Sequence, residues 1–337
     1  MSTDSGEKPA ASMWFRLIGR QRPLWITLVI GLLLIVAPLV AAHLDGLLDD
    51  LFSQGHWRLM LGPGVVIAYI LVVAPFVEQA EAGVIDAFRP LVLIDDDAFD
   101  QMVLEASRIN PIGEGVAFGL GAVLGVWIGQ SWVLDSDAFW LERVLIPSMA
   151  LMFSLLLWTI YVALAGTRLN AALHRQPLRV DIFDTKPFWP VGRQSLIIAL
   201  VFVGGMVLGM LGGFVEDSLL DWRNWLLYSL LALVAVLVFF LNMRPTHRVL
   251  AAEKKQELGS VQERILLACR ALMARFEAEE DTGTLGAEIN ALVAYEKRIQ
   301  ETSTWPYDTA MLRTLFFSVI FPAVAALARI AGEFLVG

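Results

Sequence analysis

Cysteine is almost absent from this chain of 337 residues, which contains Cys269 alone. A single cysteine cannot form a disulfide within the chain, and this fits a reducing compartment. Histidine is also scarce, because only His43, His56, His174 and His247 occur, and they are scattered. Neither an HExxH motif nor paired cysteines accompany them. We therefore expect no metal site and no cofactor.

Short motifs of common catalytic and nucleotide-binding sites are missing as well. The sequence has no G-x-S-x-G turn, no P-loop and no G-x-G-x-x-G after a predicted strand. The formal net charge is −9, and no basic face has the density needed to follow phosphates, so we expect no nucleic-acid partner. We assign no catalytic residue and lean towards a protein that is not an enzyme.

Apolar residues dominate the chain. They make up 57 % of it, and the mean hydropathy is +0.64, which is too apolar for an ordinary soluble domain. Several apolar runs reach the length of about 20 residues that crosses the hydrocarbon of a bilayer. We predict an all-α, polytopic membrane protein with six spans and a seventh, C-terminal span. The predicted spans are residues 24–42, 59–77, 115–134, 144–165, 195–215, 225–243 and 311–328.

These spans divide the chain into four predicted parts. Residues 1–23 form a disordered, basic interfacial N-terminus, and residues 24–243 form a six-span membrane domain with a loop at 78–114. A helical hairpin follows at 244–308, and residues 309–337 form the C-terminal membrane segment. That last segment has Pro322 in its middle and either spans the membrane or re-enters it. We expect it to span, because re-entrant backbone needs a protein-lined cavity.

The distribution of positive charge predicts the orientation. With the N-terminus inside, all but four of the 25 Lys and Arg residues fall on the inner side, the exceptions being Arg58, Arg143, Arg223 and Arg329. By the positive-inside rule, the N-terminus, the 78–114 loop and the hairpin are cytoplasmic. Size and composition suggest a bacterial inner membrane.

Ionisable residues are nearly missing from the first six predicted spans. Carriers driven by protons or sodium ions usually hold ionisable groups at membrane depth. Their shortage argues against such a carrier. It leaves open a pathway for an apolar or lipid-like solute, or a pore lined by backbone and hydroxyl groups.

An acidic run, Asp95-Asp96-Asp97 with Asp100 close behind, lies in the 78–114 loop. It lacks the glycine and the distant glutamate of a calcium-binding loop. We interpret it as the N-terminal cap of a short amphipathic helix rather than as a metal site.

Glycines recur every fourth residue in two predicted spans. Such spacing forms a groove of small residues on one helix face, where another helix can approach closely. Plain helix packing, in the manner of a glycine zipper, is the expected role, and a sliding or pore-lining surface is the alternative. The glycines are Gly121, Gly125 and Gly129 in the third span and Gly205, Gly209 and Gly213 in the fifth.

The hairpin carries two apolar stripes with coiled-coil-like spacing, joined by a turn at 281–283. Neither helix can bury its stripe alone. The stripes therefore pack on each other, on a second copy of the chain, or on a cytoplasmic protein. The candidate contact residues are Leu258, Ile265, Leu272 and Phe276 on the first helix and Leu285, Ile289 and Leu292 on the second.

Four basic residues, Arg244, Arg248, Lys254 and Lys255, lie just beyond the sixth span. Charge that sets the topology explains them, and contact with anionic lipid headgroups is a second interpretation. Together these patterns favour a non-enzymatic scaffold or signalling and interaction protein that acts through the hairpin. The alternative is a channel or transporter for an ion or an apolar solute through the glycine-rich spans.

Overall fold

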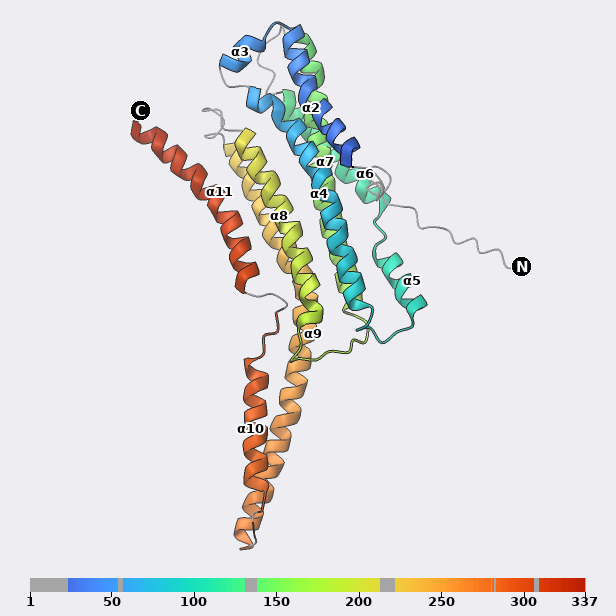
Figure 1. The fold of residues 1–337 in the computed structure, drawn as a ribbon, viewed down its shortest axis with the longest axis vertical. Coiled ribbons are helices and arrows are strands. Elements are labelled where there is room, and N and C mark those ends of the chain that lie inside the picture. Colours follow the sequence, from blue (N-terminus) through green and yellow to red (C-terminus); the bar gives the residue numbers. More distant parts are fainter. Residues whose placement is uncertain are drawn as a thin grey trace, which may run out of the picture.

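The computed structural model describes residues 24–53, 57–130, 138–212, 222–279, 281, 283–305 and 309–336. The predicted N-terminal part, 1–23, and Gly213 lie outside these ranges. Within them the chain is helical and has no strand, only an isolated antiparallel bridge between Val92 and Leu178. The helices, labelled in Figure 1, are α2 (Leu24–Leu44), α3 (Leu48–Ser53), α4 (Trp57–Phe88), α5 (Asp96–Ala106), α6 (Pro111–Gln130), α7 (Phe139–Leu173), η1 (Lys186–Phe188), α8 (Trp189–Gly212), α9 (Trp222–Glu277), α10 (Leu285–Glu301) and α11 (Thr309–Val336).

Six of these helices carry stretches that are long and apolar enough to cross a membrane: α2, α4, α6, α7, α8 and the first part of α9. The predicted all-α fold with six apolar spans is therefore confirmed. The seventh span stays a prediction: α11 has 28 residues, and its first part, Thr309–Phe321, is apolar.

Several helices continue well past their apolar stretches. α4 has 32 residues and α7 has 35, whereas about 20 suffice to cross the hydrocarbon. The segment 78–114, expected as a loop, is consequently mostly helix: it holds the end of α4, all of α5 and the start of α6. Polar residues that the sequence places in loops therefore lie on helices at the end of the bundle.

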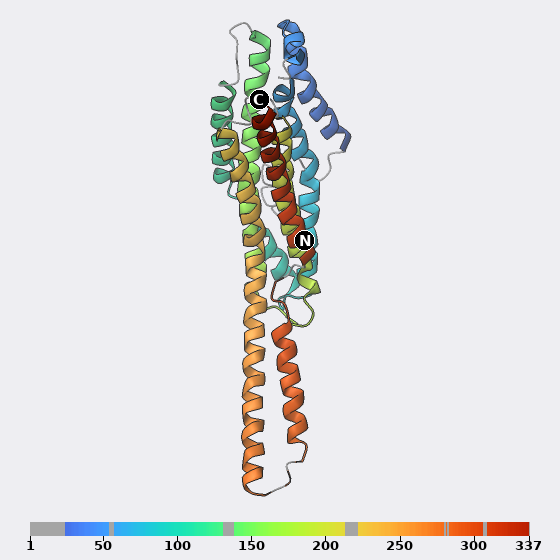
Figure 2. The ribbon, with the colours of Figure 1, turned by 90° about the vertical axis from the view of Figure 1, so that its left-hand side faces the viewer.

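α9 is the longest helix, with 56 residues and a length of about 84 Å at 1.5 Å per residue. It runs without a break through the predicted boundary at 243–244, and Pro245 lies inside it. Its distal half and α10 lie side by side and project from one end of the bundle (Figures 1 and 2). We call the part of α9 after Pro245, together with α10, the α9–α10 extension.

The bundle is centred on α8, which packs against α4, α9 and α11. Its largest apolar cluster joins Phe202 and Met206 of α8 to Val238 and Phe239 of α9 and to Leu315 of α11. α6 packs along α7, and α2 packs along α4. Burial of these side chains leaves many outward-facing aliphatic residues exposed, as expected for helices solvated by lipid.

Two glycines not singled out by spacing bring α2 and α4 together. A side chain at Gly64 would place its Cβ 2.6 Å from the Leu34 carbonyl oxygen, and one at Gly31 would lie 2.9 Å from the Ala68 Cβ. Neither position has room for a methyl group. The close approach of α2 to α4 therefore requires glycine on both helices.

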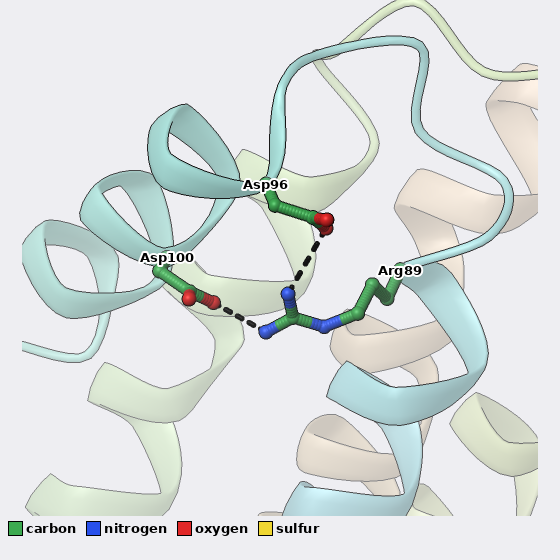
Figure 3. Close-up of polar contacts among 3 residues, drawn as sticks. All are labelled: Arg89, Asp96 and Asp100. Carbon is green, nitrogen blue, oxygen red and sulfur yellow. Dashed lines mark hydrogen bonds and ion pairs between the residues drawn. The ribbon is translucent and has the colours of Figure 1, made fainter.

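The predicted amphipathic helix within 78–114 is confirmed as α5, with Asp95 at its N-cap position. Asp95 makes no side-chain hydrogen bond to the helix end. The acidic residues have another partner: Arg89, just after α4, donates to Asp96 at 3.1 Å and to Asp100 (Figure 3). The hydrogen bond to Asp100 is the main reason that the pKa of Arg89 is raised. This fork holds α5 against the end of α4.

Candidate functional site

The base of the α9–α10 extension is held by polar contacts between the two helices. The Tyr295 hydroxyl of α10 donates a hydrogen bond to the Glu257 side chain at 3.0 Å. Partial desolvation, and then this hydrogen bond, raise the pKa of Tyr295. The Gln262 amide donates to Glu296 at 2.8 Å. These pairs set the register of α10 along α9.

Lys254 ties the end of α10 to α9. Its ammonium group donates to the carbonyl oxygens of Gln300 at 2.7 Å and Thr302 at 2.8 Å. A cation at these carbonyls also complements the negative end of the helix dipole. Lys254 is thus engaged by α10, and the predicted contact with lipid headgroups rests on the exposed Arg244, Arg248 and Lys255.

Most of the predicted partner face is turned towards the inside of the extension. Leu258 and Ile265 pack against a buried cluster of Val261, Ile299 and Ile182, the last from the α7–α8 loop. The remaining predicted contact residues, apart from Phe276, are half-buried: Leu272, Leu285, Ile289 and Leu292. Most of the predicted contact residues therefore pack within the chain. The periodicity alone was equally compatible with contacts to a partner protein.

The α7–α8 loop supports the base of the extension from a third side. The ring of Phe183 lies 5.7 Å from that of Tyr295, and the Arg298 guanidinium lies 4.8 Å from the Phe183 ring centre. After the end of α10, the ring of Trp305 stacks on that of His247 of α9, with a centroid distance of 4.0 Å and an interplanar angle of 8°. The base is consequently packed on several faces, whereas the tip depends on α9 and α10 alone.

A second apolar stripe on α9 stays exposed. Leu266 is 58 % exposed, Met273 60 % and Phe276 63 %, and the half-exposed Cys269 lies between them. The spacing of three, four and three residues is that of one seam of a coiled coil. Only Phe276 of this stripe was among the predicted contact residues. The 3-4-3 spacing was available in the sequence, but the stronger stripe beside it hid this signal.

Where the extension meets the bundle, buried polar side chains of three helices form a network, which we call the polar junction. Asn170 of α7 donates to the Gln194 amide oxygen of α8 at 3.2 Å and to the Asn242 amide oxygen of α9 at 3.3 Å. All three are at most 4 % exposed. Asn170 Oδ1 has no partner and is buried. Asn170 and Gln194 lie between the predicted spans 144–165 and 195–215, so the sequence alone did not indicate that they meet.

His174, the residue after α7, extends this junction to Thr246 of α9. Its Nδ1 lies 2.5 Å from the Asn170 carbonyl oxygen, and its Nε2 lies 2.6 Å from the Thr246 hydroxyl. A carbonyl only accepts, so Nδ1 carries the proton and Nε2 accepts from Thr246. Phe88 and Phe188 enclose the ring. Burial lowers the pKa of His174 to about 4.

An acidic side chain is also buried in the bundle, just outside the predicted span 115–134. Glu114 is 3 % exposed in the first turns of α6, and Trp158 of α7 donates to it at 3.3 Å. Glu114 lies one residue before the predicted span 115–134, yet it belongs to α6, because that helix begins at Pro111, earlier than the apolar run suggests. The shortage of charge is therefore a weaker argument against ion transport than it appears from the sequence.

The two glycine ridges face different neighbours. A Cβ at Gly121 would lie 2.7 Å from the Phe153 carbonyl carbon, and one at Gly125 would lie 2.6 Å from the Ala150 Cα, so both abut the α7 backbone. Gly129 has more room, with its nearest neighbour, the Met149 Cβ, 3.4 Å away. Gly205 and Gly209 of α8 instead lie beside the rings of Tyr69 and Tyr228.

No group of three or more His, Cys, Asp or Glu side chains in the described ranges is placed to bind a metal ion. Comparisons with protein-family models, with curated proteins and with solved structures found no match for the chain. A functional assignment therefore depends on the geometry of the chain itself.

Proposed function

We propose that the chain is a multi-pass membrane protein that acts as a scaffold or signalling and interaction protein, and that the α9–α10 extension is its interaction arm. The exposed stripe of Leu266, Met273 and Phe276 is the observation that carries this proposal. The base of the extension is packed on several faces, but this stripe offers apolar surface to water if the extension is cytoplasmic, as the positive-inside rule predicts.

The partner we propose is a second copy of the chain. α9 passes from the membrane into the extension as one helix, so two copies in the same membrane present the same stripe at the same height. A seam of 3-4-3 spacing is complementary to itself in a parallel pair. Confinement to one bilayer also raises the effective concentration of the two stripes.

The first test is the mass of the purified protein in its detergent micelle. We expect a dimer for the wild type, and a dissociation constant raised by about tenfold or more for the double variant Leu266→Gln, Met273→Gln, because two buried apolar side chains are lost. Leu267→Gln is the matched control, since Leu267 is 57 % exposed on α9 but lies about 100° around the helix from Leu266, off the stripe. Equal masses for the wild type and the double variant would contradict the proposal.

Cys269 provides an independent readout of the partner. It lies in the stripe and is the single cysteine, so a parallel pair places two copies of it opposite each other. Mild oxidation of native vesicles should give a covalent dimer that the double variant loses. A cross-link to a different protein, with no dimer, would overturn a second copy as the partner while retaining the arm as an interaction surface.

Transport of an ion or an apolar solute is the second candidate. Glu114, buried between α6 and α7, is the observation that favours an ion pathway, because intramembrane carboxylates commonly mark such routes. Flux from vesicles that contain the protein, abolished by Glu114→Gln, would support it. Flux equal to that of empty vesicles for ions and for lipids would remove it.

A further inference from the structure

A cavity of about 70 Å³ lies among α4, α7, α8 and α9, which stand side by side in the bundle (Figures 1 and 2). Its walls are formed mainly by aliphatic and aromatic side chains, among them Ile70, Phe153, Phe202 and Leu231. All of its lining residues belong to stretches that can cross a membrane. The medium around these helices is therefore hydrocarbon.

The cavity wall has three polar side chains, Tyr69, Thr159 and Tyr228, and the hydroxyls of the first two already have partners. The Tyr69 hydroxyl donates to the Val201 carbonyl oxygen at 3.0 Å, and the Thr159 hydroxyl donates to the Leu155 carbonyl oxygen at 2.7 Å. A water molecule needs two to four polar partners to occupy a buried site. The space is large enough for water, but its chemistry favours an apolar occupant.

Glycine keeps this space open at one point of the wall. A Cβ at Gly205 would find its nearest neighbour, the Tyr69 Cε1, at 3.8 Å, which is ordinary van der Waals contact. Alanine would fit there and would favour the helix more than glycine does. The neighbouring Gly204 is different, because a Cβ there would collide with the Tyr69 hydroxyl. Close packing thus explains Gly204 but not Gly205.

From the cavity, its dry wall and the unfilled space at Gly205, we propose that the α4–α7–α8–α9 cavity binds the end of a hydrocarbon chain. The acyl tail of a membrane phospholipid is the expected source, since the cavity is not fully enclosed and acyl chains surround these helices. A hydrocarbon chain in the cavity would make dispersion contacts with the lining side chains, which lack these contacts when the cavity is empty. This proposal is independent of the α9–α10 extension.

The test uses the full chain in vesicles of phosphatidylethanolamine and phosphatidylglycerol that contain a phospholipid with a photoactivatable diazirine at the end of one acyl chain. Lipid outside the bundle cannot reach Ile70 or Phe202, which are 5 % and 3 % exposed. We expect cross-links to these residues in the wild type. Gly205→Leu, which fills the cavity, should reduce them about tenfold, because several buried methylene contacts are lost.

Gly119→Leu is the matched control, because Gly119 of α6 is exposed and a Cβ there meets nothing within 4 Å. It should leave the cross-links unchanged. Gly205→Ala keeps the test informative if the leucine variant does not fold, since it should reduce labelling partly. No label on Ile70 and Phe202 in the wild type, or equal label in Gly205→Leu, would overturn the proposal.

A second arm separates the sources of the chain. A diazirine-bearing free alkane replaces the phospholipid probe in otherwise identical vesicles. Label from the phospholipid probe supports a lipid tail, and label from the alkane alone overturns the lipid source in favour of a free apolar molecule. A rise in thermal stability for Gly205→Leu, with no label in the wild type from either probe, would identify an empty packing space and overturn the proposal.

Discussion

The glycines of α6 and α8 have the same spacing but different neighbours. On α6, Gly121 and Gly125 meet the α7 backbone so closely that no side chain fits. On α8, Gly205 and Gly209 lie beside tyrosine rings and border a cavity. The pattern of small residues predicts a groove on the helix face, but the partner that enters the groove comes from the tertiary arrangement. The predictions below separate these two ridges.

The largest effect is expected at the α6–α7 contact. Gly125→Leu should lower the stability by more than about 4 kcal/mol, because its side chain must displace the backbone of α7. Thermal unfolding in detergent, followed by circular dichroism, measures the change, with Gly119→Leu on the exposed face of α6 as its control. A midpoint equal to that of the control would mean that α6 and α7 do not pack as described.

Acid should loosen the polar junction, where His174 links the end of α7 to α9, and the α6–α7 glycine contact has no such titratable link. The pKa of His174 is about 4 in the folded chain, against about 6.5 unfolded. Its contribution to stability is present above about pH 6.5 and is lost as the pH falls towards 4, by up to about 3 kcal/mol.

The measurement is the unfolding midpoint across this range, compared with His174→Gln, which cannot titrate. Loss of the pH dependence in that variant is expected. The same acid destabilisation in both proteins would assign it to other groups.

A smaller loss is expected at Gly209. A Cβ there would lie 3.3 Å from the Tyr228 Cε1, so the ring must shift by a few tenths of an ångström. Gly209→Ala should therefore destabilise by about 1 kcal/mol. Combining it with Tyr228→Leu should remove the loss, and purely additive effects in this double-mutant cycle would argue against the contact.

The smallest effect, of opposite sign, is expected at Gly205. Gly205→Ala should stabilise by about 0.5 kcal/mol in detergent, because alanine favours the helix and its methyl group has room. We predict that Gly205 has room for a methyl group and that Gly209 does not. If Gly205→Ala lowered the stability more than Gly209→Ala does, this prediction would be wrong.

The sequence was sufficient for the spans, because hydropathy over about 20 residues directly reflects the demand of the bilayer. It was insufficient for the polar junction. Asn170 follows one apolar run and Gln194 precedes the next. They come close to Asn242 because α7 and α8 extend beyond those apolar runs. Glu114 was misplaced for the same reason. Hydropathy indicates where the apolar run stops, whereas the helix continues until its terminal backbone groups find other partners.

Periodicity predicted the stripes of the α9–α10 extension but not their partners. Ile265 packs inside the extension and Leu272 is half-buried, whereas the residues that directly follow them, Leu266 and Met273, are exposed. The two apolar stripes of α9 are rotated by about 100° from each other around the helix. Both have coiled-coil-like spacing, so the sequence pattern alone does not show which of them packs against α10. The stripe that faces α10 is set by the turn and by the hydrogen bonds of Lys254, Glu257 and Gln262. Their partners on α10 are 34 to 46 residues away in the sequence.

The continuity of α9 has a mechanical consequence. From Pro245 to its end at Glu277, the helix reaches about 50 Å beyond the bundle. A tilt of the membrane segment by about 5° therefore moves the tip by about 4 Å, if the helix stays straight. The polar junction lies at the pivot of this lever, where Asn242 and Thr246 flank Pro245. A small change of helix tilt at the junction therefore produces a larger displacement of the tip. Conversely, a force on the tip exerts a torque on the hydrogen bonds of the junction.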